Sequence, residues 1–170
     1  MLKKPVSDLF DFRQALGCFA TGVSVVTTYS APLRPDAGDG SVGVTVNSFS
    51  SVSLDPPLVA FSLYRIGRRI SQFIEAGHFC INVLAREQEA LSRQFSAANA
   101  DVTCESVGYT LGTVGSPVLA HVLASFECTL EDTVEGGDHL LFLGRVQHYA
   151  YDASKTPLLF FRGTYTGLTG

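Results

Sequence analysis

The segment from residue 42 to residue 63 constrains the fold more than any other part of the chain. Its first six residues alternate between valine and small or polar residues, Val42-Gly43-Val44-Thr45-Val46-Asn47. This period-two pattern predicts a strand with one buried face. A serine-rich stretch follows, and Pro56-Pro57 precede a second apolar run over residues 58–63. We therefore expect two strands that flank a polar loop.

Similar runs elsewhere predict further strands and a few short helices. Apolar or alternating segments favour strands at residues 23–29, 79–84, 124–131, 139–149 and 157–161. The spacing of apolar residues predicts helices at about 9–19, 68–76 and 86–95, with Asp8 capping the first and Gly77 ending the second. The segments 31–41 and 96–108 are expected to be irregular. The helices are too few to cross between parallel strands, which predicts a mainly β fold, an antiparallel barrel or sandwich with peripheral helices.

The composition fits a globular protein that binds neither nucleic acid nor membrane. A length of 170 residues most simply forms one domain, residues 1–170, and 46% apolar with 16% charged residues is a globular composition. The net charge is −4 and no basic cluster extends beyond Arg65, Arg68 and Arg69, which argues against nucleic-acid binding. Apolar runs are far shorter than a membrane span and the N-terminus lacks a signal-peptide core, so we expect a cytoplasmic protein. A mean hydropathy of +0.22 favours a homodimer that hides apolar surface.

Neither the cysteines nor the glycines form a recognisable cofactor motif. Cys18, Cys80, Cys104 and Cys128 show no C-x-x-C spacing and are predicted to be reduced core residues. No two histidines have ligand spacing with cysteine or carboxylate neighbours, so we expect no metal site. Residues 38–43 match the dinucleotide fingerprint G-x-G-x-x-G, but a predicted strand follows them where the fingerprint needs a helix. We interpret these glycines as turn residues.

The serine-rich stretch is the first candidate binding segment. Asn47, Ser48, Ser51 and Ser53 offer small donors, and an irregular loop offers free backbone amides. This chemistry suits a ligand with many hydrogen-bonding groups, although an ordinary serine-rich turn has the same composition.

Two further candidates are charged or titratable. The arginines at 65–69 come just before a predicted helix, where they form either an anion site or a solvated basic turn. His139 follows Gly-Asp and comes directly before an apolar strand. The other histidines, His78, His121 and His148, belong to no motif, and we expect them at the surface or at strand edges.

Five segments, in the same order along the chain, share motifs with one known family. They are Phe19-Ala-Thr-Gly-Val23, Thr45-Val-Asn-Ser-Phe-Ser-Ser-Val-Ser-Leu-Asp-Pro-Pro57, Phe79-Cys-Ile-Asn-Val-Leu84, Gly137-Asp-His139 and Pro157-Leu-Leu-Phe-Phe-Arg-Gly-Thr-Tyr165. Together they resemble the flavin reductase-like family, the small reductase components of two-component flavin monooxygenases. The resemblance implies that family's antiparallel split β-barrel, the Greek-key barrel that binds FMN or FAD.

The resemblance also implies which residues contact the cofactors. Thr45, Val46, Asn47 and Ser48 match the flavin-binding segment as one group. Further flavin-contacting positions are Ser51, Val52, Ser53, Ser62, Arg65, Arg68 and Asn82. His139 matches the position that contacts the nicotinamide, and Tyr165 belongs to the closing motif beside the nicotinamide pocket. From the residues alone, Ser62 can also be a solvent-facing strand residue and Tyr165 a residue that caps the core.

The function implied is that of an NAD(P)H-dependent flavin reductase that supplies reduced flavin to a partner monooxygenase. Hydride passes directly from the reduced nicotinamide to the flavin, so no side chain is expected to act as a catalytic acid or base. The sequence leaves FAD or FMN, and NADH or NADPH, open. Two alternatives are a self-contained split-barrel flavoenzyme of the pyridoxine-phosphate-oxidase-like type and a non-catalytic flavin-binding protein.

Overall fold

The computed structural model describes residues 6, 8–30, 39–67, 69–96 and 102–168. Its helices are α1 (Leu9–Leu16), α2 (Ile70–Ala76) and α3 (Glu89–Ser96), with short 3-10 helices η1 (Arg86–Gln88) and η2 (Cys104–Val107). Its strands are β1 (Thr21–Gly22), β2 (Ser24–Tyr29), β3 (Ser41–Val46), β4 (Ser50–Leu54), β5 (Pro57–Tyr64), β6 (His78–Val83), β7 (Tyr109–Leu111), β8 (Pro117–Leu119), β9 (Ala124–Gly136), β10 (His139–Tyr151), β11 (Leu159–Phe161) and β12 (Thr164–Thr166). Most of the loop expected at 31–41, and part of that at 96–108, lies outside the described residues.

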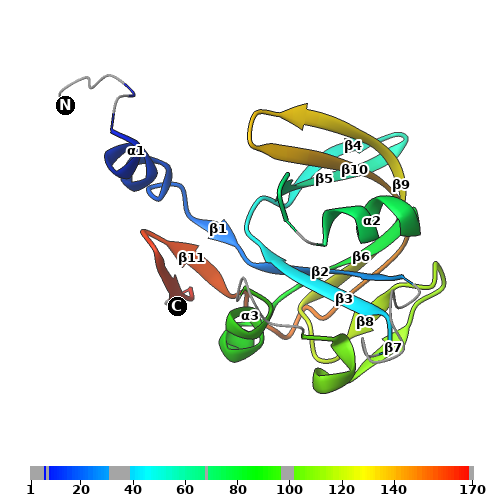
Figure 1. Cartoon of the computed structure of the whole chain (residues 1–170). Helices are drawn as coiled ribbons and strands as arrows, with labels where there is room; N and C mark the ends of the chain where they lie inside the picture. The colour runs from blue at the N-terminus through cyan, green and yellow to red at the C-terminus, as the bar shows by residue number, and fades with distance from the viewer. Residues whose placement is uncertain (1–5, 7, 31–38, 68, 97–101, 169–170) are drawn as a thin grey trace.

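Seven strands form one antiparallel sheet in the order β3-β2-β6-β9-β10-β5-β4. The long pair β9 and β10 is bent by irregularities between Leu143 and Gly144 and between Val146 and His148. In Figure 1 the sheet curls, so that β5 and β10 stand opposite β2 and β3. The prediction of a mainly antiparallel β fold with a few helices is confirmed.

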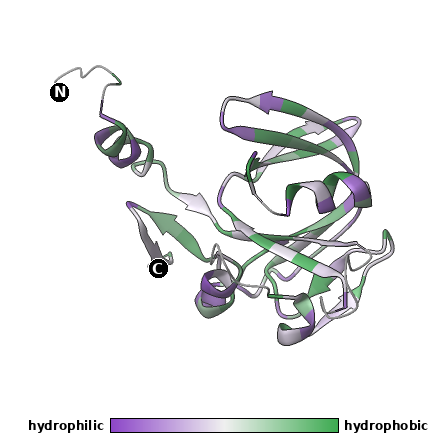
Figure 2. Ribbon diagram, viewed as in Figure 1, coloured by the Kyte–Doolittle hydropathy of each residue, from purple (hydrophilic) through white to green (hydrophobic). Residues whose placement is uncertain are grey.

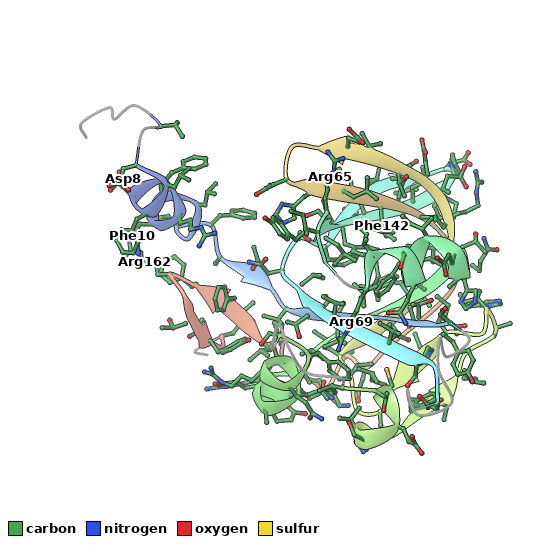
Figure 3. The ribbon with its side chains drawn as sticks, in the orientation of Figure 1. Asp8, Phe10, Arg65, Arg69, Phe142 and Arg162 are labelled. Carbon is green, nitrogen blue, oxygen red and sulfur yellow. The ribbon has the colours of Figure 1, made fainter. Side chains whose placement is uncertain are left out.

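Four phenylalanines from four different elements form the centre of the larger core. Phe61 of β5 and Phe142 of β10 are stacked, with ring centroids 5.0 Å apart. Phe79 of β6 meets Phe61 edge-on at 5.0 Å, and Phe73 of α2 meets both stacked rings at 6.1 Å. All four are buried, and Figure 3 places Phe142 inside the curve of the sheet. Each buried ring stabilises the fold by roughly 1.5–3 kcal/mol, so this cluster fixes the two halves of the sheet against each other.

A second core lies where α3 and the C-terminal segment meet the sheet. Its buried residues include Val23, Val25, Leu84, Phe95 and Leu158. The small sheet β1-β11-β12 flanks this core, and β7 pairs with β8 as a separate hairpin. This second core positions the C-terminal strands next to the end of β3.

The helix α1 stands apart from both cores (Figure 1). As predicted, Asp8 caps it, with its carboxylate accepting hydrogen bonds from the amides of Phe10 and Asp11 at 2.9 and 3.2 Å. The helix ends at Leu16, earlier than expected, and none of its residues is buried. Leu9 and Phe10 are 71% and 73% exposed, and Figure 2 shows hydrophobic and hydrophilic stretches side by side on this helix. The apolar side chains of α1 are thus uncovered within the described chain.

The serine-rich stretch was expected to be a loop, but it contains the edge strand β4. Ser50 and Ser51 pair with Ala60 and Val59 of β5. Serine composition suggests a loop because serine rarely lines a core, but an edge strand needs only backbone partners on one side. Most of the β4 side chains are exposed, which explains why polar residues are accepted there.

The remaining local predictions are mostly confirmed. Gly77 ends α2 with a left-handed φ of 68°, and a strand follows Gly40, whose φ is 85°. Three of the cysteines are buried and free, whereas Cys18 is exposed, so its assignment to the core is wrong. Burial raises the pKa of Cys104 and of Cys128 to about 12, which leaves both as unreactive thiols. No described helix is long and apolar enough to cross a membrane.

Gly144 tests the packing of the larger core. A Cβ atom there would overlap the ring of Phe79, which is fully buried and has no room to withdraw. We expect Gly144→Ala to lower the free energy of unfolding by about 1–3 kcal/mol in urea titrations. The control Gly22→Ala places its Cβ in open space and should change stability by less than about 0.5 kcal/mol. Equal midpoints for the two variants would contradict the packing described.

Candidate functional site

Three adjoining cavities meet at Asn47, which follows the end of β3. The strand cavity, of about 310 Å³, is lined by Val44, Thr45, Val46, Asn47, Ser48, Ser62, Leu63, Tyr64 and His139. The C-terminal cavity, of about 190 Å³, is lined by Val23, Thr45, Val46, Asn47, Ser96, Phe160 and Tyr165. The α1 cavity, of about 650 Å³, lies between α1, Asn47 and the turn after β11. Asn47 lines all three, so its side chain is within reach of a ligand in any of them.

The strand cavity gathers six of the predicted residues. The end of β3 supplies Thr45 and Val46 to one wall, and Asn47 and Ser48 follow them. Antiparallel pairing of β10 with β5 aligns His139 with Tyr64, and their rings meet edge-on with centroids 5.7 Å apart. Ser62 lies two residues before Tyr64 on the same face of β5. The register of these strands thus brings distant parts of the sequence to one cavity.

The hydroxyl of Ser48 is engaged within the protein. It accepts a hydrogen bond from the backbone amide of Ser62 at 3.0 Å and donates to the carbonyl of the same residue at 3.3 Å. These bonds join the chain leaving β3 to the neighbouring part of β5. Ser48 therefore shapes the cavity through its hydroxyl rather than presenting that hydroxyl to a ligand.

The C-terminal cavity depends on Ser92 of α3, which the sequence did not single out. The Ser92 hydroxyl lies 2.8 Å from that of Tyr165, and the Ser92 carbonyl accepts a hydrogen bond from the Thr45 hydroxyl at 2.7 Å. The Arg93 guanidinium lies 4.8 Å from the centre of the Tyr165 ring, and Phe160 meets the same ring at 5.3 Å. One buried serine thus holds both walls of the cavity. Helical periodicity places Ser92 on α3 but does not tell which segments it contacts.

The hairpin between β9 and β10 positions His139. Its Nδ1 lies 2.7 Å from a carboxylate oxygen of Asp138, and this hydrogen bond lowers the pKa of Asp138. A carboxylate accepts only, so Nδ1 carries the proton and Nε2 of the neutral ring remains an acceptor. Asp138 also accepts a hydrogen bond from the backbone amide of Arg65 at 2.9 Å through its carbonyl. These contacts orient the imidazole at the edge of the strand cavity.

Two of the predicted arginines, Arg65 and Arg69, do not line either of the two ring-sized cavities. Arg65 pairs with Glu135 at 3.3 Å and lines a cavity of about 400 Å³ next to Asp138. Arg69 donates to the carbonyl of Gly43. Arg68 lies outside the described residues.

Four other predicted site residues are not brought to these cavities. Asn82 is fully buried, donates to the carbonyl of Val25 at 3.1 Å and accepts from the amide of Leu119 at 2.9 Å. Its amide links three strands and is inaccessible to a ligand. The residues at 51–53 lie on β4 and line none of the three cavities.

Among the remaining histidines, His121 and His148 are exposed, as expected. His78 is instead partly buried, with Nδ1 2.7 Å from the hydroxyl of buried Ser116. Burial lowers the pKa of His78. It packs as a structural residue, because strand β6 runs through the middle of the sheet and not along its edge.

The side chains that line the two ring-sized cavities suit planar ligands with polar edges. Across the described residues, no carboxylate lines either cavity, and no cluster of three or more metal-ligating side chains occurs. Hydroxyls, one carboxamide, one imidazole and aromatic rings form the walls. Such walls can hold and stack two rings.

Comparison with known proteins agrees with this geometry. Residues 16–169 match the model of the flavin reductase like domain, and the chain therefore belongs to that family. It is 39% identical over 158 residues to the reductase subunit HsaB of a flavin-dependent monooxygenase from Rhodococcus jostii, covering 92% of this chain and 76% of the relative. It is 41% identical over 162 residues to the NADH-dependent FMN reductase AsuE2 of Streptomyces nodosus subsp. asukaensis, covering 93% and 84%.

A solved structure extends the likeness to three dimensions. The NADH:FAD oxidoreductase SgcE6 of Streptomyces globisporus, in complex with NAD and FAD fragments, superposes with a TM-score of 0.89 at 30% identity. The match covers 99% of this chain and 98% of the other.

The role of Ser92 can be tested through stability. We expect Ser92→Ala to lower the free energy of unfolding by about 1–3 kcal/mol, because the partly buried Tyr165 hydroxyl loses its partner. The control Ser106→Ala removes an exposed hydroxyl and should change little. Urea titrations of both variants provide the comparison. Identical unfolding curves would show that Ser92 does not hold the cavity walls.

Proposed function

We propose that this protein is a flavin reductase that oxidises NADH or NADPH and supplies reduced FMN or FAD to a partner monooxygenase. The single observation that carries the proposal is the common wall of Thr45, Val46 and Asn47 between two ring-sized cavities. A flavin and a nicotinamide bound against these shared residues would lie next to each other, and direct hydride transfer needs such proximity. The family and the names of its reductase members support the same conclusion.

We place the flavin ring across Thr45, Val46 and Asn47, with Ser48 and Ser62 shaping the adjoining wall. Its phosphate-bearing chain leaves past Tyr64 toward Arg65, and the exposed serines of β4 are proposed to contact it. The nicotinamide nucleotide covers the exposed face of the ring, between His139 and Tyr165. Asn82 is not part of this proposal, because it is buried within the sheet.

The residues of the chain would hold and orient the nucleotides, which supply a hydride donor and a hydride acceptor. Asn47 offers a carboxamide to the polar edge of a ring. His139, fixed by Asp138, offers Nε2 as an acceptor for a carboxamide donor of the nicotinamide. The lack of carboxylates in the described lining favours a ring that gains negative charge on reduction.

We also infer that the curved sheet is the split barrel of this family. The hydrogen bonds between Ser48 and Ser62 support this, because they bridge the chain end of β3 to β5 across the opening of the sheet. The whole chain, residues 1–170, is then one domain.

The proposed activity is tested by mixing the purified protein with NADH and free FMN or FAD. We expect rapid loss of the near-ultraviolet absorbance of NADH, and repeating the assay with NADPH gives the nucleotide preference. No loss with either nucleotide would favour a non-catalytic flavin-binding protein. Oxidation of pyridoxine phosphate without added nicotinamide nucleotide would favour the self-contained flavoenzyme.

Replacing His139 should affect the nicotinamide and spare the flavin. We expect His139→Ala to raise KM for NADH roughly fivefold, the effect of losing one hydrogen bond, with flavin affinity unchanged. His148→Ala, an exposed histidine on the same strand, is the matched control. Steady-state kinetics and flavin titrations measure the two quantities. Normal NADH dependence with weakened flavin binding would move His139 to the flavin site.

We propose further that the protein is a homodimer in which α1 packs on the partner subunit. The uncovered apolar residues of α1 support this, since contiguous exposed apolar surface favours association. Light scattering should give a dimer at micromolar concentration, and the double variant Leu9→Ser, Phe10→Ser should shift it toward monomer. Leu111→Ser, an exposed leucine of β7, is the control. A monomeric wild-type protein would contradict the proposal.

A further inference from the structure

The α1 cavity is the largest of the three and has no role in the function proposed so far. Its volume is about 650 Å³, and it shares Asn47 and Phe160 with the C-terminal cavity. The two cavities are therefore neighbours, and one extended molecule could occupy parts of both. Its size is within the range of small-molecule sites, and its lining holds two arginines.

The two arginines come from opposite sides of the cavity. Arg13 belongs to α1, and Arg162 lies in the turn between β11 and β12, beneath α1 in Figure 3. The backbone amide of Arg162 donates to the carbonyl of Gly17 at 2.9 Å, which fastens this turn to the end of the helix. This hydrogen bond thus connects the two segments that carry the cationic side chains.

Neither arginine is neutralised by a carboxylate within the described part of the chain. The ion pairs found there, such as Arg145 with Glu131, involve other residues. Arg162 stacks on the ring of Phe161, with its guanidinium carbon 5.0 Å from the ring centre. In a protein with a net charge of −4, two unpaired guanidinium groups on one cavity form a local anion-attracting surface.

A third observation points to a ligand. The hydroxyl oxygen of Thr21 is buried and has no hydrogen-bond partner among the described residues. Thr21 lines the α1 cavity together with the arginines. A buried hydroxyl without a partner is costly, and a small shift of Thr21 on binding would let a ligand oxygen supply the missing hydrogen bond.

The α1 cavity also lies within electrostatic reach of the hairpin that holds His139. The pKa of Asp138 is lowered first by the hydrogen bond from His139 and, to a smaller extent, by the positive charge of Arg13. Arg13 is therefore close enough to this hairpin for its charge to act on Asp138.

We propose that the α1 cavity binds the adenosine diphosphate half of a dinucleotide, with the diphosphate between Arg13 and Arg162. The other half of the same molecule lies in the neighbouring ring-sized cavities, beyond Asn47 and Phe160. Guanidinium groups suit this ligand because their planar donors match phosphate oxygens in pairs. The inference rests on the proposed reductase function and adds the part of the site that separates dinucleotides from mononucleotides.

ADP alone is the direct probe, measured by calorimetric titration of the purified protein. We expect Arg13→Gln and Arg162→Gln each to weaken ADP binding about tenfold, the effect of one lost charge-assisted contact. Arg13→Lys and Arg162→Lys keep the charge and should lose less. Arg145→Gln makes the same charge change on β10, away from this cavity, and should bind ADP as the wild type does. Urea midpoints verify that each variant is folded.

Two further comparisons show whether the ADP half that binds in this cavity belongs to NADH or to FAD. If it belongs to NADH, the arginine variants raise KM for NADH and leave KM for reduced nicotinamide mononucleotide unchanged. If it belongs to FAD, they weaken FAD binding and spare FMN. Either result supports the assignment of the cavity. Unchanged affinity for ADP, NADH and FAD in both folded glutamine variants overturns it, and a wild type that binds ADP but reduces no flavin refutes the reductase function instead.

Discussion

The stacked pair of Phe61 and Phe142, with Phe73 and Phe79 against its edges, is the contact on which the rest of the structure depends. It joins β5, β10, β6 and α2 inside the curved sheet. The curvature that it fixes brings the end of β3 close to the end of β5, although these strands are not neighbours in the sheet. The binding cavities open at this junction and exist because the core behind them is tightly packed.

The walls of the candidate site are held in place by hydrogen bonds within the protein. Ser48 bonds to the backbone of Ser62, and Ser92 bonds to both Thr45 and Tyr165. These contacts fix the walls of two cavities from strands, a helix and the C-terminal segment. Such supporting hydrogen bonds hold ligand-facing groups to within a fraction of an ångström, which contact between two cofactors requires.

The sequence predicted the pieces whose evidence is local. Alternation of valines located β3, the capping carboxylate of Asp8 located α1, and the left-handed Gly77 located the end of α2. Edge strand β4 was missed because its serines do not form the alternating apolar pattern of a strand with a buried face. Its pairing with β5 uses backbone groups, which all residues have in common. Local pattern therefore predicts elements better than it predicts their partners.

The candidate site shows the same limit at the level of single residues. The segment at 45–48 was singled out from its sequence and lines the cavities, whereas the amide of Asn82, also singled out, forms hydrogen bonds within the sheet. Ser92 and Arg13 were overlooked because their positions at the cavities depend on where α3 and α1 lie in the fold, which no short motif encodes. The sequence names chemical groups, and tertiary packing decides which of them face a cavity.

The position of Asn47 at the meeting point of three cavities has a thermodynamic consequence. A ligand that fixes its side chain removes rotational freedom that a second ligand would otherwise have to remove itself. Occupancy of one cavity then strengthens binding in the next, and linkage requires the effect to be equal in both directions. If the cavities bind ligands as proposed, a single exposed carboxamide makes the affinities of separate ligands interdependent.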